Sequence, residues 1–107
     1  MSGVETLVAI DQVLDETYRV VISVKRVPPS HTFPDGIKSR YVLINMHTGK
    51  PVLLFDNHEP FGYHWHPDPA GQKALRLSLP TAEYGKALDL FWKKVEEVRG
   101  GNLKCDF

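Results

Sequence analysis

The residues best suited to chemistry are gathered in one run, 54–66, with the sequence LFDNHEPFGYHWH. This run holds three of the five histidines, His58, His64 and His66, beside the carboxylate of Asp56. Histidine has an unperturbed pKa close to neutral, so grouped imidazoles can transfer protons, bind a metal or respond to pH. The run is therefore the candidate functional segment.

Acid–base chemistry on RNA is the first interpretation of this segment. RNA carries its own nucleophile, the 2′-hydroxyl, so a ribonuclease needs only a proton acceptor, a proton donor and a cation for the phosphate. His58 and either His64 or His66 can serve as the two proton-transfer groups. Asp56 can orient an imidazole by accepting its Nδ1 proton. This catalytic set requires no metal and no cofactor.

The substrate-binding candidates are neighbouring side chains. Arg40 can bind a phosphate, and Tyr63 and Trp65 can stack on unpaired bases, as recognition of single-stranded RNA commonly requires. His31 joins this set because its loop is expected at the same end of the sheet as Arg40.

Metal binding is a second interpretation. His64 and His66 are two residues apart, so they point to the same side of an extended segment and form a metal-ligand pair. His58 or Asp56 could complete such a site.

A third interpretation is structural. Asp56 and Asn57 are a common turn pair whose side chains bond nearby backbone amides. Phe61 or Trp65 could simply fill the end of the sheet. Three histidines on one short loop favour function over this interpretation.

The sequence before and after the run predicts the sheet that positions it. Segment 17–27 alternates apolar, largely β-branched residues with polar ones, which is typical of a half-buried strand. Segments 40–46 and 51–55 predict two more strands joined by a tight turn. Weaker strands are expected at about 8–14 and 74–79.

An amphipathic helix is predicted from Thr81, its expected N-cap, to Arg99, with Gly100-Gly101 as the stop. The expected fold class is α+β, an antiparallel meander of about five strands packed by this one C-terminal helix. Its apolar stripe recurs at helical spacing, and comprises Tyr84, Ala87, Leu88, Phe91, Val95 and Val98. Leu75, Leu77 and Leu79 are expected to share the core with this stripe, and Trp92 to lie at its rim.

The up-and-down course of the strands brings the candidate residues to one end of the sheet. Asp56 and His58 follow a strand that ends where the loop of His31 and the strand of Arg40 begin. His47 lies beside the turn at the opposite end, about 20 Å away at ~3.3 Å per residue. His47 is therefore excluded from the site.

Length and charge narrow the classes of protein. The 107 residues suit a single domain, 1–107, with a core at about 7–99 and a polar tail at 100–107. Thirteen basic and thirteen acidic residues leave no net charge, which disfavours extended DNA binding but permits a local phosphate site.

Targeting signals are missing from the sequence. No apolar stretch approaches the roughly 18 residues of a membrane span, and the N-terminus lacks the pattern of a signal peptide. The lone Cys105 has no partner for an internal disulfide. These features favour a cytoplasmic protein that does not bind membranes.

The histidine run and the C-terminal helix of this chain resemble those of the TumE-type toxin family of bacterial toxin–antitoxin loci. The resemblance rests on Phe55-Asp56-Asn57 at the end of a strand, Gly62, His64-Trp65-His66 and the helical pair Phe91-Trp92. It spans about residues 17–98. Pro60-Phe61-Gly62 and Trp65 stand where members often carry a Lys-Gly step and a basic residue, which predicts a weaker grip on phosphate.

The resemblance implies growth inhibition, a cognate antitoxin as partner and attack on RNA or translation. The leading expectation is therefore a toxin-like protein that acts as a metal-independent ribonuclease. One alternative is a non-enzymatic binding or assembly module anchored by Tyr63, Trp65 and Trp92, with Leu90 on a second contact surface. The other is a small metal-binding protein. The sequence makes no prediction about homo-oligomers.

Overall fold

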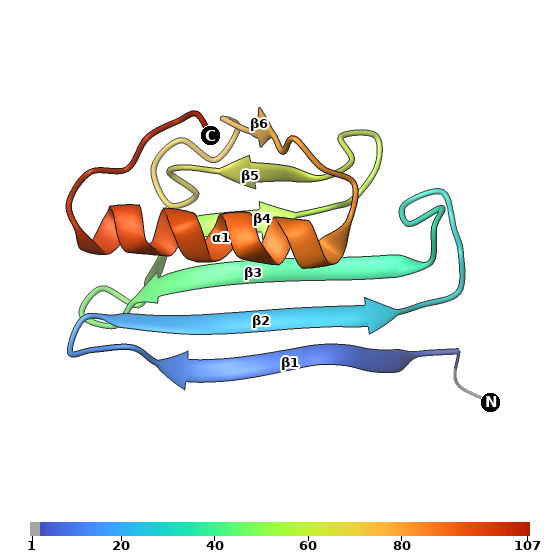
Figure 1. Cartoon of the computed structure of the whole chain (residues 1–107), viewed down its shortest axis with the longest axis horizontal. Helices are drawn as coiled ribbons and strands as arrows, with labels where there is room; N and C mark the ends of the chain where they lie inside the picture. Colours follow the sequence, from blue (N-terminus) through green and yellow to red (C-terminus); the bar gives the residue numbers. More distant parts are fainter. Residues whose placement is uncertain (1–2) are drawn as a thin grey trace.

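The computed structural model of the chain describes residues 3–107. The fold is α+β: six antiparallel strands form one meander sheet in the order β1-β2-β3-β4-β5-β6, and one C-terminal helix packs on it. Figure 1 shows the helix lying across one face of the sheet, over β3 and β4. The elements are β1 (Glu5–Val13), β2 (Tyr18–Arg26), β3 (Ile37–Asn45), β4 (Lys50–Asp56), β5 (His64–His66), β6 (Leu77–Ser78) and α1 (Tyr84–Arg99).

The predicted meander is confirmed, with one additional strand. The segment that carries His64 and His66 is itself the short strand β5, which pairs with β4 on one side and β6 on the other. The expected strand at 74–79 is reduced to Leu77–Ser78. The sequence alone indicates only an extended loop at 64–66, because three residues are too few to display a strand pattern.

The core lies between the helix and the near face of the sheet. Alternate residues of the strands face the helix, and α1 contributes Ala87, Phe91 and Val95, each 0% exposed. Phe91 packs against the rings of Tyr41 and Phe55 at centroid distances of 5.7 and 5.3 Å. Each fully buried aromatic of this kind contributes on the order of 3 kcal/mol to folding.

Two predictions about the helix and the segment before it are wrong. The N-cap is Glu83, not Thr81, whose hydroxyl instead accepts a hydrogen bond from the backbone N–H of Glu83, before the helix begins. Leu75 is exposed rather than in the core. Leu90, expected on a second contact surface, packs against the core, and Trp92 lies at its rim as predicted.

The C-terminal segment is held against α1 by a buried lysine. Lys94 is 0% exposed, and its Nζ donates hydrogen bonds to Glu97 and to the carbonyl oxygens of Lys104 and Asp106. The ring of Phe107 packs on the ring of Trp65, with their centroids 5.7 Å apart. The segment 100–107, predicted as a polar tail, is exposed except at Leu103, and these contacts hold it at the edge of the core.

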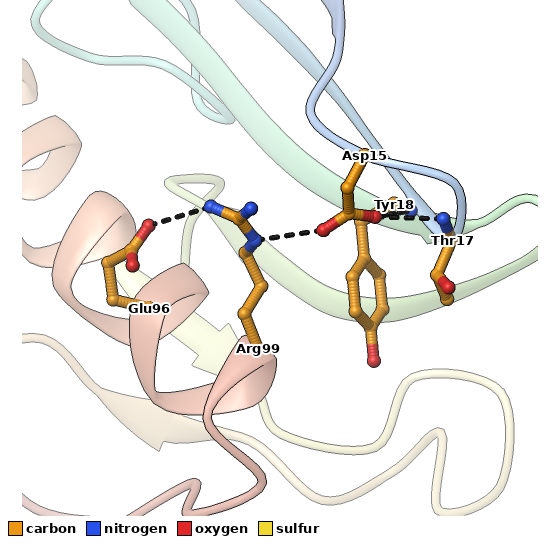
Figure 2. Close-up of polar contacts among 5 residues, drawn as sticks. All are labelled: Asp15, Thr17, Tyr18, Glu96 and Arg99. Carbon is orange, nitrogen blue, oxygen red and sulfur yellow. Dashed lines mark hydrogen bonds and ion pairs between the residues drawn. The ribbon is translucent and has the colours of Figure 1, made fainter.

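The turn between β1 and β2 is tied to the far end of the helix (Figure 2). One carboxylate oxygen of Asp15 accepts hydrogen bonds from the backbone amides of Thr17 and Tyr18, each at 2.8 Å. The other accepts a hydrogen bond from Arg99 Nε at 3.0 Å, and Arg99 also binds Glu96. This chain of contacts links the edge of the sheet to the last turn of α1.

Within residues 3–107 there is no helix of the length and apolar character that crossing a bilayer requires.

Candidate functional site

A polar row crosses the sheet on the face opposite the helix. Phe55 and Trp65 are paired across β4 and β5 and lie in the core, so the neighbouring pair Asp56 and His64 faces the other way. The same register places Arg40 opposite Asp56 on β3. We call this helix-free side of the sheet the outer face.

The three histidine rings of the run converge on the outer face. The centroids of His58 and His64 are 4.9 Å apart, and those of His64 and His66 are 5.1 Å apart, each pair in an edge-to-face arrangement. His64 and His66 do point to the same side, as predicted from their spacing. His64 is only 1% exposed and His66 8% exposed, so these two rings do not line an open, water-filled pocket.

His58 is the accessible histidine of the three. Its Nδ1 lies 3.3 Å from Oδ2 of Asp56, and the two side chains are 36% and 19% exposed. The other carboxylate oxygen of Asp56 accepts a hydrogen bond from the backbone N–H of Asn57 at 2.7 Å. The carboxylate is therefore fixed where it can orient the His58 ring, which is the geometry expected for an Asp–His pair.

His64 is held by the loop that precedes it. Its Nδ1 lies 2.8 Å from the carbonyl oxygen of Gly62, a residue with φ of +62°. Glycine adopts this left-handed conformation without a Cβ penalty, so Gly62 allows the turn that aims its carbonyl at the ring. Burial lowers the pKa of His64 from its usual value, which favours the neutral ring.

His66 is held by the segment that follows β5. Its Nδ1 lies 3.1 Å from the carbonyl oxygen of Leu75. Burial is the main cause that lowers the pKa of His66, and the nearby Arg76 guanidinium lowers it further. Both buried histidines are therefore favoured as neutral rings with Nδ1 as the donor.

Phe61 and Arg76 flank the histidines. The Phe61 ring contacts the rings of His58 and His64, each at a centroid distance of 5.7 Å. The Arg76 guanidinium stacks on Phe61 at 3.7 Å from the ring centroid. Arg76 was not among the predicted site residues, because no local pattern places its guanidinium on Phe61.

Arg40 is where the prediction placed it, next to Asp56 and exposed. No ion pair or side-chain hydrogen bond engages its guanidinium among residues 3–107. Lys25 and Lys38 are paired across β2 and β3, two residues along each strand from the pair Ser23 and Arg40. These three exposed cations lie on the outer face beside the histidines. The sequence alone leaves the face of Lys25 open.

The two aromatic candidates, Trp65 and Tyr63, are buried to different degrees. Trp65 is 0% exposed in the core, against Phe55 and Phe107. Tyr63 is half-buried against the same core, and burial raises its pKa. A fully buried Trp65 cannot stack on a base, because alternation along β5 turns it toward the helix. Tyr63 precedes β5, and its role in stacking on bases stays a prediction.

The two remaining histidines lie where the topology predicted. His31 is exposed and shares a shallow groove with Glu59 and Pro60 of the β4–β5 loop, so it belongs to the same end of the sheet. The two loops are joined by a hydrogen bond from the Glu59 amide to the Thr32 carbonyl. His47 lies in the turn between β3 and β4, at the other end.

The chain matches no protein-family model, no curated protein and no solved structure. The resemblance to the TumE-type toxins stays a prediction from its motif residues.

Proposed function

We propose that this chain is a toxin-like protein of the bacterial cytoplasm that cleaves RNA without a metal, with His58 as its general base and Asp56 orienting the His58 ring. The supporting observation is the Asp56–His58 contact of 3.3 Å on a sheet face that also carries three exposed cations. A cognate antitoxin is the expected partner.

The reaction follows from these positions. His58, oriented by Asp56, takes the proton of a 2′-hydroxyl, and the 2′-oxygen bonds to phosphorus as the bond to the 5′-oxygen breaks. The leaving 5′-oxygen takes a proton from water, and the imidazolium of His58 returns its proton to solvent. Arg40, with Lys38 beside it, binds the phosphate oxygens and stabilises their developing charge.

His64 and His66 have a different place in this proposal from the one their sequence suggested. Both are buried behind His58, and burial favours their neutral rings, so neither is a ready proton donor. We assign them to holding the His58 ring, which His64 contacts edge to face.

Cleavage of a labelled single-stranded RNA in excess EDTA tests the proposal. We expect cleavage by the wild type and a loss of about 10²- to 10⁴-fold in His58→Ala, the range of one general-base group. His47→Ala, which changes the same residue type at the opposite end, is the matched control and should keep full activity. No cleavage by the wild type, or equal rates in His58→Ala, contradicts the proposal.

Growth of a bacterial host tests the toxin part separately. Induced wild-type protein should stop growth, and Asp56→Asn and His58→Ala should relieve the arrest at equal expression. Normal growth with the wild type removes the toxin hypothesis, whereas arrest by all three proteins removes the assigned catalytic pair.

A further inference from the structure

His64 carries a buried polar atom that the proposed reaction does not use. A carbonyl oxygen only accepts hydrogen bonds, so the 2.8 Å contact with Gly62 requires that Nδ1 of His64 holds the proton. Nε2 is then an unprotonated acceptor, and it is buried without a hydrogen-bond partner among residues 3–107. A buried acceptor left unpaired in this way is unfavourable, so a partner at this position would be stabilising.

Two further ligand-type groups lie beside the His64 ring. One ligand atom from each of Asp56, His58 and His64 lies within 4.8 Å of the other two. Ligand atoms around a tetrahedral ion at 2.0–2.1 Å are about 3.4 Å apart, so the groups must approach by roughly an ångström. His58 can make this movement because it is on a loop and 36% of its side chain is exposed.

The surroundings resemble the outer shell of a metal site. Metal-ligating histidines generally donate their other ring nitrogen to a backbone carbonyl or a carboxylate, which fixes the tautomer and the ring orientation. His64 donates Nδ1 to the Gly62 carbonyl, and Asp56 is itself held by the Asn57 amide. The Gly62 contact therefore fixes the tautomer of His64, with Nε2 unprotonated, before any ion arrives.

The donor set indicates the class of ion. Two imidazole nitrogens and one carboxylate oxygen suit Zn²⁺ and neighbouring first-row ions, whereas Mg²⁺ and Ca²⁺ prefer oxygen ligands alone. Three protein ligands leave a fourth position for water or a phosphate oxygen. Arg40, opposite Asp56 on the next strand, is placed to meet an anion there.

We infer that Asp56, His58 and His64 together bind one divalent ion of the Zn²⁺ class on the outer face. His66 is outside the site, in contrast to the His64–His66 pair that spacing alone suggested, because it does not belong to the converging group.

Binding of the ion has a consequence for the proposed cleavage, and only this consequence rests on the proposed function. The ion takes the lone pairs of His58 and Asp56 that metal-free proton transfer needs. One equivalent of Zn²⁺ should therefore inhibit the EDTA-resistant cleavage, and excess EDTA should restore it. An increase in rate on adding Zn²⁺ overturns this consequence.

Calorimetric titration of untagged, EDTA-stripped protein with ZnCl₂ tests the site itself. We expect one ion per chain, and a loss in affinity of at least 10-fold, on the order of 100-fold, in Asp56→Asn and in His58→Ala. Both positions are partly exposed, so these variants keep the fold, which circular dichroism checks. Co²⁺ should give the visible absorption bands of a four-coordinate site in the wild type.

Exposed histidines are the control for adventitious binding. His31→Ala and His47→Ala should bind Zn²⁺ as tightly as the wild type, since both side chains lie outside the converging group. No stoichiometric binding, equal affinity in Asp56→Asn, or equal weakening in the two control variants overturns the inference. Because titration needs no RNA, failure of the cleavage assay leaves this result standing.

Discussion

At the scale of single residues, the three consecutive residues Phe55, Asp56 and Asn57 at the end of β4 lie in three different environments. Phe55 points into the core, where it contacts Trp65 and Phe91. Asp56 points to the outer face and holds His58. Asn57 is buried, accepting a hydrogen bond from the Ser39 amide and donating one to a backbone carbonyl of β3. These three consecutive residues therefore connect the core, the candidate site and the neighbouring strand β3.

Trp65 gives a direct test of the difference between a packing and a binding aromatic. Trp65→Ala should lower the free energy of unfolding by about 3–5 kcal/mol, because it removes a fully buried ring. Trp65→Phe should cost less than half as much. It keeps the ring contacts and removes a buried N–H that has no partner in the described structure. Urea denaturation measures both values.

RNA binding separates the two roles of Trp65 further. The Trp65 ring and the Asp56 carboxylate lie on opposite faces of the sheet, so folded Trp65→Phe should bind single-stranded RNA like the wild type. A loss of RNA affinity in this variant without a loss of stability would contradict the packing assignment.

At the scale of elements, α1 does more than cover the sheet, because its buried lysine also holds the C-terminal segment. Lys94→Met keeps much of the apolar stem and removes the donor that binds two backbone carbonyls and Glu97. We expect a loss of about 3–5 kcal/mol in the free energy of unfolding, since the acceptors lose their buried partner. Lys93→Met, at the exposed neighbouring position, should change stability by less than about 0.5 kcal/mol.

Hydrogen exchange of residues 103–107 identifies the cause of that loss. These amides should exchange faster in Lys94→Met than in Lys93→Met, because the segment is no longer tied to the helix. Unchanged exchange in Lys94→Met would show that the lysine does not hold this segment.

The Asp15 contacts predict how stability responds to acid. The amide of Thr17 and then that of Tyr18 lower the pKa of Asp15 from its ordinary value of 3.8, with a smaller contribution from Arg99. A carboxylate whose folded pKa is depressed adds stability above the unfolded value, and this stability is lost as pH falls through the folded pKa. Stability should therefore fall below about pH 4.

Two variants separate the contributions to this acid response. Asp15→Asn should remove it, so that the melting temperature changes less between pH 5 and pH 2.5 than in the wild type. Arg99→Gln keeps both amide bonds and should remove only a minor part (Figure 2). A larger effect of Arg99→Gln than of Asp15→Asn would show that the arginine, and not the two amides, dominates the pKa of Asp15.

Elements with a long repeating pattern were predictable, and short ones were not. The residues of β2, β3 and β4 display period two, and α1 displays an apolar stripe, so their positions follow from the sequence. β5 has three residues, and only the register with β4 makes it a strand. Lys94 could not be foreseen in the core, because its buried state depends on carbonyls ten and twelve residues further along the chain.

The candidate site was predictable as a set of residues but not as a geometry. Spacing placed His64 and His66 on one side, and the strand order brought Asp56 and Arg40 together. Burial of the two histidines depends on Phe61, Arg76 and the backbone after β5, which no local pattern reveals. The burial of Trp65 also depends on contacts that are distant in the sequence, so the sequence alone suggested an accessible ring.

At the scale of the whole molecule, the two faces of the sheet have different characters. The helix and the C-terminal segment lie over one face (Figure 1). The outer face carries the polar row and the exposed cations of β2 and β3. The chain has no net charge, so any attraction to RNA must come from this uneven distribution. A local patch of three cations predicts weak, strongly localised binding rather than coating of a strand.

The salt dependence of RNA binding measures that patch. Three phosphate contacts on a single strand give a slope of about −2 in a plot of log affinity against log salt, since each contributes roughly −0.7. Fluorescence anisotropy of a labelled single-stranded RNA should show this slope for the wild type. The triple variant Lys25→Ala, Lys38→Ala, Arg40→Ala should bring the slope close to zero.

A second triple variant, Lys86→Ala, Lys93→Ala, Lys104→Ala, is the control, because it makes the same change in net charge on α1 and the C-terminal segment. It keeps the three phosphate contacts of the outer face, so its slope should stay at about −2. Equal effects of the two triple variants would mean that net charge, and not the outer face, governs binding.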